Sequence, residues 1–79
     1  PNPFNEATTI TYTVPATGRV RLQVSTVEGR PVDTLREEQT QPGEQRYVWN
    51  TTQLAPGTYL VSLLLNDEVL TERAVKVEN

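Results

Sequence analysis

Apolar and polar residues alternate along most of this chain, and the alternation predicts β-strands. The apolar positions of residues 8–14 are Ile10, Tyr12 and Val14, with threonines between them. In residues 19–27, Val20, Leu22 and Val24 occupy alternate positions, with Arg and Gln between them. A period of two is typical of a strand that has one face buried and one face in water. Both segments are therefore expected to be half-buried strands.

The middle of the chain predicts shorter elements. Residues 31–35 are expected to form a short strand with Val32 and Leu35 as its apolar contacts. Because proline has no N–H to donate to a hydrogen-bond ladder, this strand should begin at Pro31 or lie at a sheet edge. The polar residues 36–42 are expected to form a loop. Residues 44–49 then restart the alternation, with Tyr47 and Trp49 on one face.

The last third of the chain predicts a hairpin. Residues 58–65 are apolar on both faces, as in a central strand, and strand character returns from residue 68 to the end. Asn66 and Asp67 fit a two-residue turn, while Gly18 and Gly29 mark turns earlier in the chain, with Gly18 free to take a positive φ. About seven short strands with turns every 8–12 residues predict an all-β fold, an antiparallel immunoglobulin-like β-sandwich.

The segment before the first strand has a different character. It opens "PNPFN", and two prolines make a central strand impossible there. We expect residues 1–7 to be an N-terminal strap that delivers Phe4 against the open end of a sandwich formed by residues 8–79, with Asn5 capping the turn.

Composition narrows the possible functions. The chain has 79 residues, which fits one domain, and it lacks both Cys and His. Disulfides, thiol nucleophiles and the commonest metal ligands are thereby removed, and no cofactor is expected. A net charge of −3 argues against nucleic-acid binding, and no apolar run is long enough to cross a bilayer. The start at Pro1, without a signal peptide, suggests a piece cut from a longer chain.

Candidate chemistry is sparse. The paired carboxylates Glu37-Glu38 and Asp67-Glu68 lie in predicted loops without calcium-loop spacing, and are best interpreted as solvated charge. Ser25 and Ser62 have no His to activate them. Asn50 begins a glycosylation pattern, but an Asx turn uses it equally well. An enzyme is not expected.

Aromatic and basic residues each leave an alternative open. An exposed aromatic strip would favour a carbohydrate-binding module, but the aromatic residues fall on predicted inward faces and are expected to form core: Tyr12, Tyr47, Trp49 and Tyr59. Three arginines, Arg19, Arg21 and Arg46, are expected to form at most a small basic stripe on the surface.

Five stretches, taken in order, resemble one family. They are PNPFNEATTITYTVP (1–15), GRVRLQVSTVEGRPVDTL (18–35), PGEQRYVWN (42–50), LAPGTYLVSL (54–63) and TERAVKVEN (71–79). Together they are similar to the type A C-terminal sorting domain of type IX secretion cargo in Bacteroidota, and also to the immunoglobulin-like domain of flagellar hook-capping proteins. The most specific parts are the opening Pro-Asn-Pro-Phe-Asn, the Val-x-Gly-Arg-x-Val-x-x-Leu run at 27–35, which contains Gly29, and the Gly-x-Tyr of Gly57 and Tyr59.

The resemblance implies a targeting module without catalysis. Such a domain directs a fused N-terminal cargo from the periplasm across the outer membrane to the cell surface. In many cargoes a sortase-like machinery then removes the domain and attaches the cargo to the surface, and in others the domain stays on and holds the protein there. It also implies that the terminal strand carries the signal, and the matching residues are Arg73, Val75, Lys76 and Val77. The ending Glu78-Asn79 departs from the family's basic end. Ser25-Thr26 replace the aromatic–Asp pair that is common before the Gly-Arg turn, and Asn50 stands where Asp often follows the Trp.

A terminal strand is a plausible signal physically, because a receptor strand can add to its edge. In that hypothesis Val75 and Val77 anchor the strand while Arg73 and Lys76 supply charge. Two other interpretations stay open: a carbohydrate-binding accessory module, and a structural immunoglobulin-like spacer of an extracellular enzyme.

Overall fold

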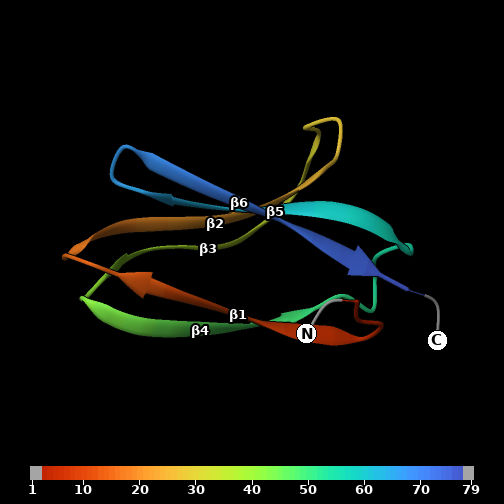
Figure 1. Ribbon diagram of the computed structural model, residues 1–79, viewed down its shortest axis with the longest axis horizontal. Helices are drawn as coiled ribbons and strands as arrows, with labels where there is room; N and C mark the ends of the chain where they lie inside the picture. Colours follow the sequence, from red (N-terminus) through yellow and green to blue (C-terminus); the bar gives the residue numbers. More distant parts are fainter. Residues whose placement is uncertain (1–2, 78–79) are drawn as a thin grey trace.

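Six strands make up the structure, a computed structural model that describes residues 3–77. They are β1 (Ala7–Val14), β2 (Gly18–Thr26), β3 (Pro31–Thr40), β4 (Gly43–Asn50), β5 (Gly57–Leu65) and β6 (Glu68–Lys76). Figure 1 shows them as two layers, with β1 and β4 below the other four.

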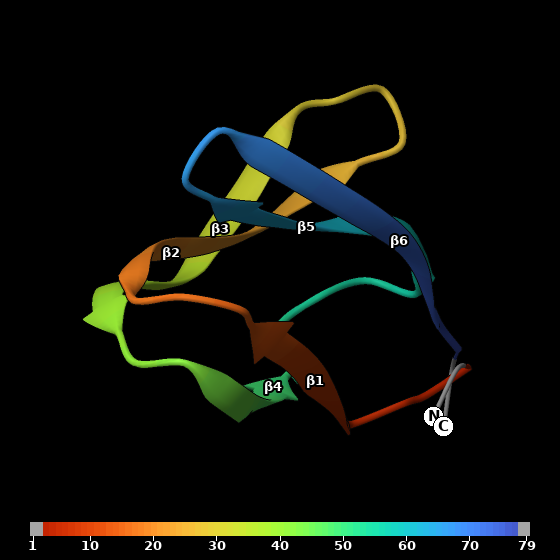
Figure 2. The same cartoon turned by 60° about the vertical axis from the view of Figure 1, so that its left-hand side comes forward.

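The two layers are separate antiparallel sheets. The smaller sheet pairs β1 with β4, and the larger has the order β3-β2-β5-β6. Figure 2 shows the larger sheet above the smaller one. The predicted antiparallel sandwich is confirmed, and so are the central position of β5 and the edge position of the strand that begins at Pro31. The number of strands among the described residues is six, where about seven were expected.

One predicted loop is wrong, because most of it belongs to a longer strand β3. Residues 36–40 continue β3 alongside β2, with Arg21 opposite Glu37 and Arg19 opposite Gln39. The polar composition suggested a loop, but β3 is an edge strand whose residues are mostly exposed, so water solvates its polar side chains. Val32, expected as an apolar contact, is itself exposed, whereas Leu35 packs against the core.

The turns follow the sequence with one exception. Asn66 has φ 54° in the β5–β6 turn and Gly29 has φ 90° between β2 and β3, as turn chemistry predicts. The expected positive φ at Gly18 is wrong. Gly18 is a buried residue at the start of β2, where an added Cβ would lie 2.8 Å from Asn66 Oδ1, so a larger residue there would require the Asn66 side chain to move.

The core lies between the sheets and has two connected parts. Strand β2 contributes its apolar face to both, because Val20, Leu22 and Val24 are each almost fully buried. One part holds Tyr12, Val14, Val20, Leu22 and Leu63; the other holds Phe4, Val24, Trp49 and Ala74. The second part lies beside the end of β6 and determines how that strand is held.

Candidate functional site at the C-terminal strand

Strand β6 carries the sequence-predicted signal and lies at an edge of the larger sheet. It pairs with β5 from Glu68 to Lys76, and the tight turn at Asn66 fixes the register. On its other side no strand runs along it among residues 3–77. Backbone hydrogen-bonding groups on such an edge are the usual template for pairing with another chain.

The N-terminal strap covers one end of this edge. The Phe4 N–H donates to the Val75 carbonyl at 3.0 Å, and the Val77 N–H donates to the Phe4 carbonyl at 2.8 Å. These bonds form a parallel bridge between Phe4 and Lys76. Pro1 and Asn2 of the predicted strap lie outside the described residues. The described part of the strap therefore pairs with the last residues of β6 and leaves the rest of the β6 edge uncovered.

An aromatic cluster anchors the strap from inside. The Phe4 side chain is only 7 % exposed, and its ring centroid lies 5.5 Å from that of Trp49. The Trp49 ring in turn meets Tyr59 edge-on, with centroids 6.3 Å apart. Tyr59 is half-buried and donates its hydroxyl to the Ala55 carbonyl at 2.6 Å. Strap, β4 and β5 thus converge beneath the end of β6, where Ala74 completes the cluster.

Lys76 lies inside this end of the protein. It is 7 % exposed, and its ammonium donates to the carbonyls of Thr51 and Leu54, the latter at 2.5 Å. Thr51 is fully buried and donates both its N–H and its hydroxyl to the Glu6 carbonyl, at 2.8 and 2.9 Å. The charge of Lys76 therefore holds residues 51–54 to the C-terminal strand, and those residues hold the strap.

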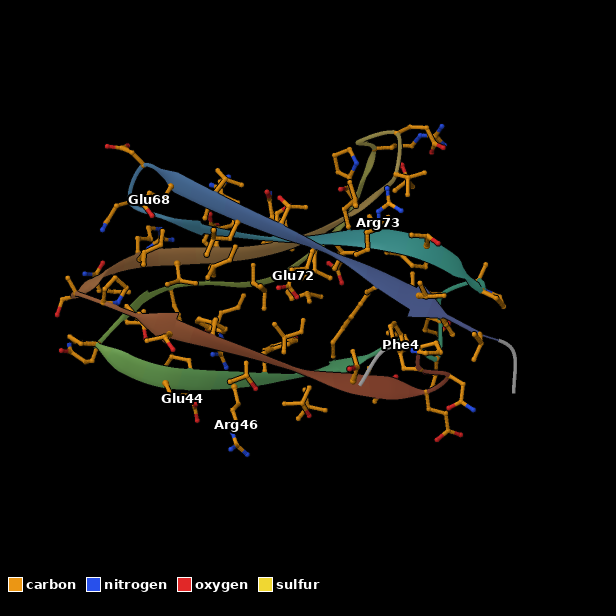
Figure 3. The ribbon with its side chains drawn as sticks, in the orientation of Figure 1. Phe4, Glu44, Arg46, Glu68, Glu72 and Arg73 are labelled. Atoms are coloured by element: carbon orange, nitrogen blue, oxygen red, sulfur yellow. The ribbon has the colours of Figure 1, made fainter. Side chains whose placement is uncertain are left out.

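The other predicted recognition residues are more accessible. Arg73 is exposed, Val75 is half-buried and Val77 is 40 % exposed, while Glu78 and Asn79 lie outside the described residues. Figure 3 shows Arg73 on β6, away from the smaller sheet. The structure thus divides the predicted set: Lys76 is committed to internal contacts, and Arg73 and Val77 face solvent.

A second polar network lies at the far end of the sandwich, and sequence reasoning missed it. The Arg36 guanidinium donates to the Tyr12 hydroxyl at 2.9 Å, pairs with Glu38 at 3.2 Å and lies 5.1 Å from the Tyr47 ring centroid. The bond to Tyr12 raises the pKa of Arg36 above its already high value. No local pattern marks this network, because Arg36 and Tyr12 are 24 residues apart.

The remaining candidates have structural surroundings. The Asn50 side chain accepts the Thr52 N–H at 3.0 Å, which is the expected Asx turn. The Ser62 hydroxyl bonds to that of Thr71 at 3.1 Å. Gly57, with φ 153°, starts β5. Glu37, expected in a loop, lies in β3 and pairs with Arg21 at 2.5 Å. Arg46 does not join Arg19 and Arg21, because it lies on β4 in the other sheet.

Nothing in the described chain suggests metal chemistry. Within residues 3–77, no three His, Cys, Asp or Glu side chains gather in a way that could hold a metal ion. The same residues include no helix long and apolar enough to span a membrane.

Comparison with known proteins supplies the family. The model of the secretion system C-terminal sorting domain matches residues 1–77, which is nearly the whole chain. No curated protein and no solved structure matches significantly. Domains of this family are sorting signals that mark proteins for export by the type IX secretion system to the cell surface or the extracellular space. The chain belongs to the secretion system C-terminal sorting domain family.

Proposed function

We propose that this chain is a non-catalytic label on a larger secreted protein, and that the export machinery reads it through the folded edge of β6. The observation that carries the proposal is the division of labour within that strand. Lys76 and Ala74 are buried and fix the strand, whereas Arg73 and Val77 are presented on the surface. A receptor would therefore meet a rigid strand with one accessible cation and an apolar end.

The partners follow from this role. The first is the outer-membrane translocon, which would meet the edge of β6 by strand addition. The second is the sortase-like attachment machinery, which would act at the junction between this domain and an N-terminal cargo. In this arrangement the strap of residues 1–7 borders the cargo, and the sandwich from residue 8 onward is the label.

The carbohydrate-binding alternative has less support. Stacking on sugar rings needs exposed aromatic faces, and this chain has one Phe, three Tyr and one Trp in total. Phe4, Tyr12 and Trp49 are buried, and Tyr47 and Tyr59 are half-buried. A spacer role is opposed by the family itself, whose members are sorting signals.

The test is export of a passenger protein fused to the N-terminus of this domain in a bacterium that has the type IX system. Removing residues 72–79 would be uninformative, because it also removes Ala74 and Lys76 from the core. Point variants are sharper. We expect Arg73→Glu and Val77→Asp to lower the amount of passenger at the surface several-fold while leaving the thermal midpoint of the isolated domain close to that of the wild type.

The matched control is Arg46→Glu, an exposed charge reversal on the other sheet. We expect it to leave export unchanged. Wild-type export by both Arg73→Glu and Val77→Asp, or an equal loss with Arg46→Glu, would show that the C-terminal strand is not what the machinery reads.

A further inference from the structure

A groove of about 440 Å³ separates the edge strand β6 from the edge strand β1. Its floor is apolar and is formed by Leu22, Trp49, Val61 and Leu63. One wall is β1, and the other is β6 through Leu70, Glu72, Arg73 and Ala74. Figure 3 shows Glu72 between the two sheets. The volume is within the usual range of about 300–1,000 Å³ for ligand sites.

Strand β1 presents its backbone edge to this groove. Side chains of a strand alternate between its two faces, yet the consecutive residues 8–13 all line the groove. A continuous row of lining residues arises when a strand lies edge-on to a cavity. On its other edge β1 pairs with β4, and among residues 3–77 it has no second strand neighbour. The groove therefore offers a sheet edge along one wall.

The opposite wall is an uncovered part of the inner sheet face. Residues paired directly across antiparallel strands point to the same face, and Leu70 and Glu72 pair with Leu63 and Val61. Leu63 is core, so Leu70 and Glu72 also face inward. Leu70 is nevertheless 65 % exposed. The two-stranded sheet is too narrow to cover β6, and a third strand beside β1 would lie below Leu70.

Charge indicates what kind of strand would fit. Glu72 projects into a largely apolar groove, and within the described residues it forms no ion pair. Glu68 lies on the same inner face of β6, because it pairs with Leu65, which is two positions after Leu63 on β5 and therefore shares its face. Inward-pointing charges on an edge strand oppose its pairing with a second copy of itself. They favour a guest that carries a cation.

We propose that this groove is a docking site for an extended segment of another protein, which adds to the outer edge of β1 as a third strand. Every second side chain of this guest segment faces the groove. One of them is a Lys or Arg that faces Glu72, and the apolar residues two positions before and after it cover Leu70. Main-chain hydrogen bonds to β1 supply affinity, and the groove side chains supply selectivity. The proposal does not rest on the export role, since it concerns binding by the isolated domain.

The test uses the 79-residue chain and a labelled peptide, acetyl-Val-Thr-Lys-Thr-Val-Thr-Val-amide. Its matched partner has Glu in place of Lys, and a third peptide keeps the Lys but is N-methylated at alternate amides. Fluorescence anisotropy at low salt measures affinity, and amide NMR spectra locate the contact. We expect the Lys peptide to bind about fivefold more tightly than the Glu peptide, as for a partly exposed ion pair. The N-methylated peptide should not bind.

Protein variants assign the selectivity. Glu72→Lys should invert the preference, so that the Glu peptide binds more tightly, while the control Glu44→Lys on β4 should keep the wild-type preference. Amides of residues 9–13 should exchange more slowly with the Lys peptide bound. Equal affinity for both peptides, absence of binding by either, or NMR changes away from β1 and β6 would overturn the proposal. So would a dimer in sedimentation experiments that the peptide disrupts, because the occupant would then be a second copy.

Discussion

Replacing Phe4 by Ala tests whether the strap is a structural part of the domain. The Phe4 side chain is 7 % exposed and packs on Trp49 at 5.5 Å between ring centroids. Removing a buried Phe side chain costs about 3–5 kcal/mol, part of it from the lost aromatic pair. A domain of 79 residues has a free energy of unfolding of about 4–12 kcal/mol in total. The substitution therefore removes a large share of it.

The size of the effect makes the measurement simple. Since each kcal/mol lowers the midpoint of a small domain by about 4–8 °C, Phe4→Ala should lower it by at least about 12 °C. The single Trp lies against Phe4, so its fluorescence reports unfolding by heat and by urea at this point of the core. Phe4→Leu should lower the free energy of unfolding less than Phe4→Ala, because Leu keeps most of the buried volume.

A surface substitution sets the scale for Phe4→Ala. Val48 is 66 % exposed, and Val48→Ala should change the free energy of unfolding by no more than about 0.5 kcal/mol. If Phe4→Ala lowered the free energy of unfolding as little as Val48→Ala, the Phe4 side chain would not be part of the packed core.

Three further experiments test the polar contacts and one turn. Lys76→Met leaves two carbonyls without their donor and should cost about 2 kcal/mol or more in urea unfolding, whereas Arg46→Met on the surface should cost less than about 0.5 kcal/mol. A double-mutant cycle of Arg36→Met and Tyr12→Phe should give a coupling of about 1–2 kcal/mol. The pKa of Arg36 is raised in the folded state. The stabilisation that charged Arg36 supplies is therefore fully present below the pKa of Arg36 in the unfolded chain, and it is lost only above the pKa of Arg36 in the folded protein. The coupling energy should accordingly be equal at about pH 5 and pH 9. Gly29→Ala, at φ 90°, should lower stability by about 1 kcal/mol, and an unchanged urea midpoint would contradict the strained-turn argument.

Strand periodicity was enough to predict most strands of this fold, their buried faces and the sandwich class. The buried faces of the strands centred on Tyr12 and Leu22 follow directly from a period of two, and the Asn66 turn follows from the few residues that accept a positive φ. The extent of β3 could not be predicted in this way. An edge strand exposed along most of its length buries too little to leave an apolar pattern, so residues 36–40 look like a loop until β2 is placed beside them.

The sequence predicted which segment forms the candidate site, but not which side chains of that segment are buried and which are exposed. A Lys near the end of a chain reads as a surface charge, and only the fold brings the Thr51 and Leu54 carbonyls to it, more than twenty residues away in sequence. The same limit applies to Arg36 and Tyr12. Contacts between distant residues leave no periodic trace, so hydrogen-bonding roles of this kind require the three-dimensional arrangement.

The way β6 is held connects folding with recognition. Its last residues are fixed by Phe4 from the beginning of the chain and by residues 51–54 through Lys76. None of these contacts is local in sequence, so the strand acquires its fixed geometry only when both ends of the domain have come together. A receptor that reads the exposed side of β6 as a rigid edge would therefore distinguish a folded label from an unfolded one. The buried Lys76 would serve that selection by holding the strand in place, even though its charge never reaches the receptor.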